Sequence, residues 1–382
     1  MAKENNLIVA PQLGFVLGKI ESTSGTAESL AIGDALYASE VSWSFDRENL
    51  TRTPLSPERP GVMSAPGAAI LSYSVSSEFS APTISDSGDV PHNDVLLRAG
   101  GFQSTFDDAA DAFVYVLTSS NHKSASFEIY EFEALGTKAN KTALRGARHG
   151  WSIDCTAGEI ALLSCTGLGL GASTLGNTYV TATPASKSAV FYTDKPFICD
   201  GGHVEIVNLS DNSIYGGGSV GAPDDNYLVL GLTLDSGWTA DAQRGLSADG
   251  ASGRVRLTSG GPVTGTLQFE TVQLASTDGA FDPYALRDNT TPLEVRVKFT
   301  HNTSDHLCFN FYAQIVGVDR SDDAGRSTWT CAVELRYPEA LGGDPAVGQS
   351  PEQKFDFAAN QGLFVDVTPD DVGVLAITYY SG

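Results

Sequence analysis

Segment 142–167, TALRGARHGWSIDCTAGEIALLSCTG, constrains the fold of this chain more than any other stretch. Within it Trp151, Ile153 and Cys155 occupy every second position, with polar residues between them. A period of two places such side chains on one face of a β-strand, whereas an amphipathic helix needs a period of about 3.6 residues. The dipeptide Ala-Gly at 157–158 then supplies a reversal before the next apolar run. The segment therefore predicts two half-buried strands joined by a tight turn.

The same alternation returns far downstream, at 327–337, where Trp329 begins a second run of apolar residues at every second position. Around these two runs the pattern predicts one order of elements twice: a strand, a short helix and three more strands. In the first half these are strands 69–79, 112–118 and 124–132 and the hairpin 142–167, with a helix at 93–101. In the second half they are strands 263–274, 293–300, 306–318 and 327–337, with a helix at 281–288. The repeated order predicts that one structural unit occurs twice.

Composition agrees with an all-β chain of two domains. At 382 residues with 41% hydrophobic residues, the chain is long enough for two cores of ordinary size. Forty glycines and 17 prolines separate short apolar runs, and no stretch keeps a helical period. Residues 168–188 are rich in Gly, Ser and Thr, which is typical of a linker. We therefore expect an all-β fold with short flanking helices, arranged as two domains at 1–185 and 186–382.

Segments without alternation predict the loops. Loops are expected where polar residues, glycine or proline dominate, at 21–29, 51–66, 215–223 and 235–253. The first of them is a loop or a helix start, so the first strand is expected at 40–50. The second carries four prolines and predicts an extended loop. Alternation returns at 375–379, which predicts an edge strand near the end of the chain.

The net charge of −23 and the pI near 4.4 argue against a protein that clamps nucleic acid, because phosphate contacts need clustered Lys and Arg. A simpler explanation is that the Asp and Glu side chains only keep the protein surface soluble. The first 20 residues lack the apolar core of a signal peptide, and no window of about 20 residues is apolar enough to span a bilayer. We therefore expect a protein that folds in a cytoplasm and has no membrane partner.

No residue pattern in the chain predicts catalysis. Residues 217–221 match G-x-S-x-G and residues 216–221 match G-x-G-x-x-G, but both patterns need a helix to follow, and a strand is expected at 227–234. Residues 319–325 resemble part of a calcium loop without its bidentate Glu, which favours a turn. With 46 acidic residues, a pair of carboxylates can always be chosen, so such a pair carries no information.

Histidine and cysteine give no metal site either. His301 and His306 are five residues apart in an expected turn, a spacing that does not place both on one face of a strand. The five cysteines are odd in number and lack C-x-x-C spacing, which predicts buried thiols rather than disulfides or zinc ligands. We therefore expect no catalytic residue, no metal and no cofactor, so that the protein is not an enzyme.

Three stretches together resemble the major tail tube proteins of long-tailed, siphovirus-like bacteriophages. They are ESTSGT at 21–26, LLRAGGF at 96–102, and LRGARHGWSID with AGEIALLSCTGLG within 144–169. Their order and spacing carry the resemblance, which covers roughly residues 10–170. Beyond 185 it is thinner, with GTLQFE at 265–270 and FYAQ at 311–314 as the best points. One departure from the family pattern is His149, which stands between Arg148 and Gly150.

The resemblance implies a structural virion protein of the phage tail, assembled in the host cytoplasm. Proteins of this family are β-sandwiches with a short helix that form stacked rings around a lumen for the genome. Partners implied by the family are further copies of the chain, a tail terminator and a tape-measure protein, and DNA would pass through the lumen without specific binding. The rival interpretation is a β-sandwich binding module, such as a virion decoration or carbohydrate-binding protein.

Two tandem tube-type sandwiches would build a shared inner barrel, because pairing between subunits satisfies the backbone groups of exposed strand edges. Three chains then place six similar domains around the axis, so we expect a homotrimeric, pseudo-hexameric ring. A homohexameric ring is the alternative, in which the second half decorates the outside. If acid lines the lumen, it repels a passing polyanion.

The Pro-rich segment 50–66 is expected to connect one ring to the next. It is long and polar, yet it carries apolar residues that a solvated loop has little reason to contain. Its prolines favour extended conformations and so reduce the entropy lost on docking. The expected inter-ring contacts are Arg52, Leu55, Glu58, Arg59, Val62 and Met63.

Replacing residues 51–65 with a short Gly-Ser turn tests this interpretation. The variant should stay folded, with an unchanged β-type circular dichroism spectrum, because the segment lies between two strands. Growth into tubes, followed by negative-stain microscopy, should be lost. A shortened protein that still polymerises at the same concentration would show that another segment, such as the N-terminal arm or the tail after Pro351, mediates stacking.

Overall fold

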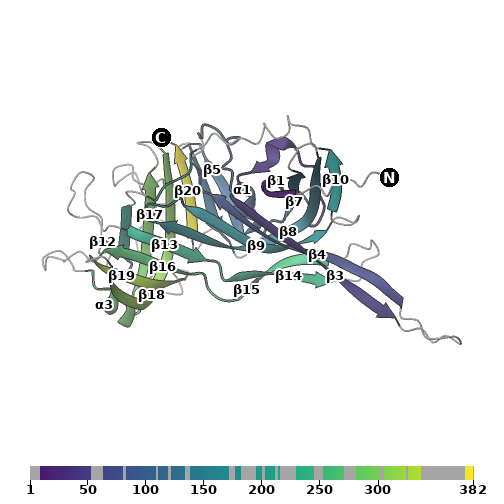
Figure 1. Ribbon diagram of the computed structural model, residues 1–382. Coiled ribbons are helices and arrows are strands. Elements are labelled where there is room, and N and C mark those ends of the chain that lie inside the picture. Colours follow the sequence, from purple (N-terminus) through teal and green to yellow (C-terminus); the bar gives the residue numbers. More distant parts are fainter. Residues whose placement is uncertain are drawn as a thin grey trace.

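The computed structural model describes residues 9–52, 63–80, 83–108, 111–118, 122–133, 138–171, 177–181, 195–199, 203–210, 214–215, 229–244, 253–270, 281–300, 305–323, 326–336 and 375–381. Over these residues the chain is all-β, as predicted, with few helical residues (Figure 1). The helical elements are η1 (Ile32–Asp34), α1 (Asp94–Ala99) and α3 (Pro283–Asp288). The strands are β1 (Val9–Ile20), β2 (Ala35–Leu36), β3 (Glu40–Arg52), β4 (Met63–Glu78), β5 (Phe102–Asp107), β6 (Ala112–Leu117), β7 (Ala125–Glu133), β8 (Lys138–Thr156), β9 (Leu162–Gly171), β10 (Asn177–Thr181), β11 (His203–Asn208), β12 (Ile214–Tyr215), β13 (Val229–Asp235), β14 (Trp238–Arg244), β15 (Gly253–Ser259), β16 (Thr264–Glu270), β17 (Pro292–Thr300), β18 (Asp305–Asp323), β19 (Arg326–Leu335) and β20 (Leu375–Ser381).

Eight of these strands form one antiparallel layer, called here the junction sheet. Its order is β3, β4, β9, β8, β13, β16, β19 and the end of β18. The centre of the layer is the pairing of β8 with β13, from Ser152 opposite Asp235 to Thr156 opposite Gly231. Strands from the two halves of the chain therefore lie side by side in one hydrogen-bonded sheet.

The pairing pattern of the first half recurs in the second. The pairs β1–β2, β1–β7, β7–β8, β8–β9, β9–β4, β4–β3 and β8–β10 occur in the first half. Their counterparts in the second half are β11–β12, β11–β17, β17–β18, β18–β19, β19–β16, β16–β13 and β18–β20. The strands β5 and β6 have no counterpart in this pattern. By pairing, β18 corresponds to β8, and β19 corresponds to β9.

This correspondence corrects the parallel expected between the two tryptophan-bearing strands. Trp151 lies in β8, whereas Trp329 lies in β19, whose counterpart is β9. Two strands with the same alternation look alike in sequence, because alternation reports a buried face and not a neighbour. The shared feature of β8 and β18 is instead their length of 19 residues each and a β-bulge in the middle.

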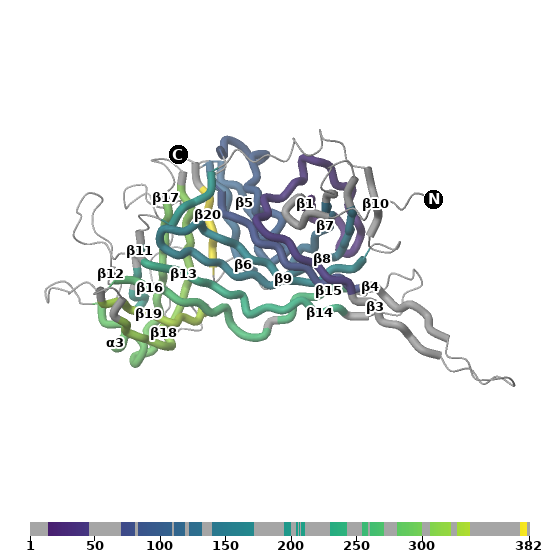
Figure 2. Tube along the Cα trace, viewed as in Figure 1, coloured from purple at the N-terminus to yellow at the C-terminus, as the bar shows by residue number. Residues whose placement is uncertain are grey.

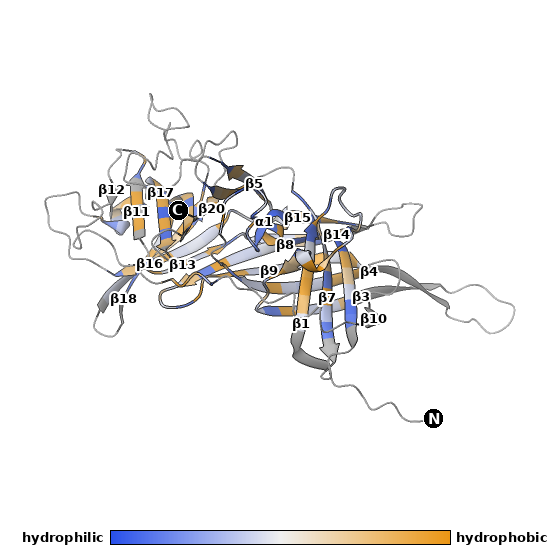
Figure 3. Cartoon of the chain, turned by 90° about the horizontal axis from the view of Figure 1, so that it is seen from above, coloured by the Kyte–Doolittle hydropathy of each residue, from blue (hydrophilic) through white to orange (hydrophobic). Residues whose placement is uncertain are grey.

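One hydrophobic core extends through both halves. Phe79 from the first half packs against Phe309 and Tyr379 from the second, with ring centroids 5.8 and 6.1 Å apart. Figure 3 shows the alternation of hydrophobic and hydrophilic positions along β17, whose Val295 and Val297 belong to this core. Among the described residues, buried side chains of both halves belong to one cluster. The expected domain boundary at 185–186 lies outside the described residues.

The C-terminal strand β20 is central, not an edge strand as expected. It pairs with β6 on one side and with β18 on the other, and its Ile377 lies opposite both Tyr115 and Phe309. Its alternation looks like that of an edge strand because only one face is apolar. Since β6 belongs to the first half and β18 to the second, β20 is a second bridge between them.

Several segments expected to be loops pair as strands. The strand β1 precedes the expected first strand, and glycine hides its alternation: a side chain at Gly14 would meet the Tyr130 carbonyl at 2.6 Å. The expected linker contains β10 and the end of β9, and the expected loop 235–253 contains β14. The acidic segment expected to be a turn continues β18 as far as Asp323. In each case the backbone pairs without a fully apolar face, so periodicity alone does not reveal the strand.

The Pro-rich segment is also more regular than expected. Strands β3 and β4 keep pairing as far as Arg52 opposite Met63, with Asn49 opposite Pro66. Figure 1 shows this hairpin running away from the body of the molecule. Proline lacks an amide hydrogen, but a two-stranded hairpin has an open side on each strand where none is needed.

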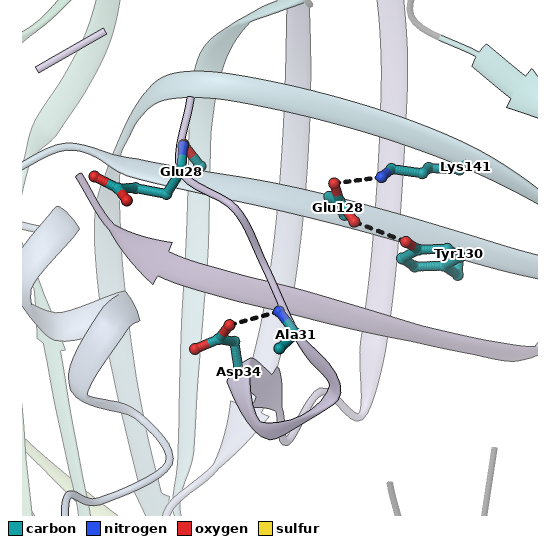
Figure 4. Close-up of polar contacts among 7 residues, drawn as sticks. Glu28, Ala31, Asp34, Glu128, Tyr130 and Lys141 are labelled. Atoms are coloured by element: carbon teal, nitrogen blue, oxygen red, sulfur yellow. Dashed lines mark hydrogen bonds and ion pairs between the residues drawn. The ribbon is translucent and has the colours of Figure 1, made fainter. Parts of the chain in front are cut away.

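Polar contacts hold β1, β7 and β8 together away from the junction sheet (Figure 4). Glu128 forms an ion pair with Lys141 and accepts a hydrogen bond from the Tyr130 hydroxyl at 2.7 Å. Phe15 of β1 stacks on the Tyr130 ring, with centroids 4.7 Å apart. Each charged group in this cluster has a partner within the chain, so the cluster has a structural explanation.

Truncating Ile377 to alanine should destabilise both halves together. The side chain is fully buried between β6 and β18, and loss of a buried isoleucine side chain costs about 2–5 kcal/mol. Because the core is continuous, urea unfolding should remain a single transition at lower concentration, whether followed by circular dichroism or by tryptophan fluorescence. Ile160→Ala, at an exposed position, is the matched control and should change stability by less than about 0.5 kcal/mol. Two separated transitions would contradict the single core.

Candidate assembly surface

The junction sheet has two open edges within the described residues. At one edge β3 pairs with β4 alone, and at the other edge residues 317–323 of β18 pair with β19 alone. An open edge presents a row of unpaired N–H and C=O groups that can pair with another strand. The two edges belong to different repeats, so their side chains differ.

Burial differs sharply between these edges and the central junction. Leu232 and Leu234 of β13 are 0% and 1% exposed, because β8 covers them. On β3, which corresponds to β13, Phe45 is 39% exposed. On β18, which corresponds to β8, Val316 is 48% exposed. An apolar side chain is thus left in solvent at the β3 edge, and the bulge of β18 exposes Val316 beside the other edge, where Val318 is buried.

Aromatic and guanidinium side chains lie at the β18 edge. The ring of Trp329 meets Tyr284 of α3 in a T-shaped contact with centroids 5.2 Å apart. The Arg320 guanidinium carbon lies 5.8 Å from the centre of the same Trp329 ring. Tyr284 is among the exposed large hydrophobic residues. Aromatic and Arg side chains of this kind are enriched where protein surfaces dock.

One face of the junction sheet carries hydroxyl groups that bond across strands. This polar face contains the pairs Ser44–Ser72, Ser76–Ser164, Thr233–Thr266 and Ser321–Thr328, with oxygen distances of 2.6, 3.2, 2.6 and 2.7 Å. Each pair joins adjacent strands at positions that alternate with buried residues. The hydroxyls therefore satisfy one another and present a neutral surface between the charged positions.

Charge on the polar face is acidic. Asp154, Asp235, Glu270 and Asp319 lie at its alternate positions, as does Glu334, which accepts a hydrogen bond from Arg336 at 2.9 Å. A surface of hydroxyls and carboxylates gives a phosphate backbone few cations to bind. This placement of part of the acid was not visible in the sequence, because it requires knowing which strands are neighbours.

Two of the stretches that carry the family resemblance, 21–26 and 144–169, meet at Glu21. Its buried carboxylate accepts hydrogen bonds from the backbone N–H groups of Gly25 and Gly146, both at 2.6 Å. The hydroxyls of Ser124 and Ser126 donate to the same carboxylate at 2.6 and 2.9 Å. A buried carboxylate is stable when several donors replace its water. Glu21 thus fixes the loop that follows it against the bulge of β8.

The GARHG stretch is this bulge and not a turn. The register of β8 against β9 shifts between Arg145 and Arg148, and Gly146 has φ +60°, a conformation that favours glycine. The expected turn of the hairpin does lie near Ala157 and Gly158, where Gly158 has φ +81°. The bulge redirects β8, so that one strand serves both β7 and the junction sheet.

His149, the residue that departs from the family pattern, is part of the core beside the bulge. Its Nδ1 accepts a hydrogen bond from the Tyr73 hydroxyl at 2.8 Å, and its Nε2–H donates to the Leu96 carbonyl at 2.7 Å. The ring is therefore neutral and joins β8 to β4 and α1. Burial lowers the pKa of His149 to about 4, and the hydrogen bond to Leu96 opposes this only in part.

Of the six expected inter-ring contacts, the structure describes only the backbones of Arg52 and Met63. These two backbones form the last described pair of the β3–β4 hairpin. Leu55, Glu58, Arg59 and Val62 lie outside the described residues. The contact itself stays a prediction.

Metal and catalytic chemistry has little support in the described part of the chain. Among those residues no group of three or more His, Cys, Asp or Glu side chains is arranged to hold a metal ion. No described helix is long and apolar enough to cross a membrane. Residues 216–221 and His301 fall outside the described ranges, and His306 is buried in β18. All five cysteines are free and buried, as predicted, and burial raises the pKa of Cys308 and Cys331 to about 12.

Comparison with known proteins adds no relative. No protein-family model matches the sequence, and no curated protein is significantly similar to it. The functional argument therefore rests on the edges and the polar face described above.

The free energy of unfolding should decrease as the pH is lowered from 6.5 to 4, and His149 should account for part of the decrease. An unfolded histidine takes up a proton near pH 6.5, whereas buried His149 does so only near pH 4, so acidification favours the unfolded chain over that interval. His149 therefore contributes stability that is present above pH 6.5 and is lost towards pH 4, by about 1.4 kcal/mol per pH unit. Urea unfolding over this range should show a shallower pH dependence for His149→Gln, whose amide keeps a donor and an acceptor. Equal slopes for both proteins would contradict the neutral, buried histidine.

Proposed function

We propose that this chain is a major tail tube subunit of a long-tailed bacteriophage, a structural virion protein that assembles into stacked rings. The observation that carries the proposal is the pairing of β8 with β13 inside the chain. The counterparts of these two strands, β18 and β3, are the open edges of the same sheet. The chain therefore contains a template for its own contact with a second copy.

In the proposed ring, β3 of one chain pairs antiparallel with residues 317–323 of β18 in the next chain. Such a contact is head-to-tail, because it joins two different edges, and it closes into a ring when the rotation per chain divides a full turn. The core-side row of β3, with Val41, Trp43 and Phe45, then lies against Val318 and Arg320. Each added strand satisfies the unpaired backbone groups of the other edge, which supports an inner barrel shared by all chains.

The stoichiometry follows from the repeated pairing pattern. Each chain supplies two four-stranded segments of the junction sheet, β3–β4–β9–β8 and β13–β16–β19–β18. Three chains then supply six segments, so the proposal is a homotrimeric ring with two tandem tube-type repeats per chain. A homohexamer remains the alternative. The pairing of β8 with β13 favours the trimer, because it puts both repeats in the same layer.

We assign to the lumen the part of the polar face that β14 and β15 leave open, since these two strands lie against β8 and β9. The carboxylates of this face repel a polyanion and its hydroxyls carry no charge that binds one, so DNA passes without specific binding. Salt screens charge beyond about 10 Å at 0.1 M, so only acid on this face itself matters for the passing DNA. A terminator at the tube end and a tape-measure protein inside are partners implied by the family resemblance, as is the location in the virion tail. In this function the chain is not an enzyme.

A binding module, the rival function, is less well supported. Such a module works as a monomer and has no need for two complementary sheet edges with exposed apolar residues. A tube subunit needs both edges. Concentration-dependent filaments in negative-stain microscopy separate the two functions, because a binding module stays a small particle.

Substituting Phe45→Lys should block ring formation without unfolding the chain. Phe45 is already partly exposed in the single chain, so its loss costs little stability there. In the ring the new ammonium would be buried without a partner, at a cost of about 3–5 kcal/mol per contact, which raises the assembly concentration roughly a hundredfold or more. Val90→Lys, at another exposed apolar position away from both edges, is the control and should assemble normally. Light scattering and microscopy that show normal tubes for Phe45→Lys would exclude β3 as the ring contact.

A further inference from the structure

The distal half of the β3–β4 hairpin pairs with no other described strand of its own chain. This arm, residues 47–52 and 63–69, pairs only within itself, from Arg47 opposite Ala69 to Arg52 opposite Met63. An isolated two-stranded hairpin is marginally stable in water, because neither face is packed. Figure 1 shows the arm extending beyond the remainder of the sheet. Its pairing so far from the body indicates that another surface supports it.

The second repeat contains the counterpart of this arm, and there the support is visible. Strands β13 and β16 correspond to the proximal halves of β3 and β4. Beyond a kink at Ser236 and Gly237 they continue as the ribbon β14–β15, and Figure 2 traces the four strands as one long bent hairpin. The ribbon contacts β8 and β9, the strands of the first repeat that flank the junction.

Specific contacts hold the ribbon against β8 and β9, the surface called here its seat. The Ser236 hydroxyl accepts a hydrogen bond from the Trp151 N–H at 2.9 Å, and the Ser236 N–H donates to the Trp151 carbonyl at 2.9 Å. Trp238 then lies beside His122, with ring centroids 5.1 Å apart. A side chain at Gly150 would come within 2.1 Å of the Trp238 carbonyl oxygen, so glycine is required there for the ribbon to approach. The ribbon and its seat therefore pack closely through specific contacts.

In the second repeat, no described pair of strands lies across the corresponding seat. It is formed by β18 and β19, the counterparts of β8 and β9, and it also contains a small residue after the bulge: Gly317. The bulge itself exposes Val316. Nothing in the described part of the chain takes the place that β14–β15 takes on the first repeat.

We propose that the arm of one chain lies across the β18–β19 hairpin of the next chain in the same ring, as β14–β15 lies across β8–β9 within one chain. This inference rests on the proposed ring, because β3 must first pair with the neighbouring β18. It gives the arm a role in addition to the contact between rings that is expected of segment 50–66. The occupant of the seat is a second copy of this chain, since the arm continues directly from the strand that forms the ring contact.

Paired cysteine substitutions with a short bismaleimide cross-linker test the arm and the ring separately. The arm pair is Thr51→Cys with Ala332→Cys, and the edge pair is Ser44→Cys with Ser321→Cys. A control pair, Thr51→Cys with Ser210→Cys, places the second thiol on the turn after β11, away from the seat. The native cysteines are all buried, and each single variant gives the background. Replacing residues 53–62 by a Gly-Ser turn in every variant removes contacts between stacked rings.

The arm pair should give interchain products on a denaturing gel at several times the yield of the control pair. Arm-pair yields at the control level, with the edge pair cross-linked, would overturn the arm inference and leave the ring intact. Absence of both products would remove the proposed ring and the arm inference with it. Hydrogen exchange gives a second measurement: amides 47–52 should become protected on assembly, and unchanged exchange in cross-linked rings would contradict the docked arm.

Discussion

Backbone pairing between β8 and β13 is the interaction on which the rest of this structure depends. It joins the two halves of the chain into one sheet and buries Ile153, Leu232 and Leu234 on the core side. Since the sheet is continuous there, each repeat is left with one open edge instead of two. A second bridge, β20 between β6 and β18, also joins the two halves by backbone pairing. The two halves therefore behave as one body with two complementary ends.

The long strands β8 and β18 make this arrangement possible. The first part of each strand pairs with β7 or β17, and the last part pairs with β9 or β19 in the junction sheet. A bulge in the middle increases local twist and redirects the strand, which a regular strand of 19 residues does not do. In β8 the bulge is fixed by the Glu21 carboxylate and by neutral His149. A buried network of this kind tolerates few changes, because any lost partner leaves a buried polar group unsatisfied.

The proposed function follows from what this body leaves unsatisfied. Two sheet edges with exposed Phe45 and Val316, and an arm without support, all point to further copies of the same chain. The polar face has the opposite character, because its hydroxyls pair with one another and its carboxylates face solvent. A tube needs both properties: surfaces that bind copies of the subunit, and a lumen that does not hold DNA.

The sequence by itself determined the fold class and many of the strands. Alternation predicted β4, β7, β9, β16, β17 and β19, because one face of each strand is apolar. Capping residues and a glycine stop predicted the helix that contains α1. It also predicted the buried, free cysteines. It missed β1, where glycines at close approach interrupt the alternation, and β14–β15, where exposed residues pair through the backbone.

Only the tertiary structure decided which strands are neighbours. Periodicity reports that a strand has a buried face, but hydrogen bonding along its edges is the same for any sequence, so the partner is not encoded locally. For this reason β20 was expected at an edge and lies in the centre, and Trp151 was matched with Trp329 across strands that do not correspond. The candidate assembly surface is defined by open edges, and an edge exists only once every other strand has found its partner.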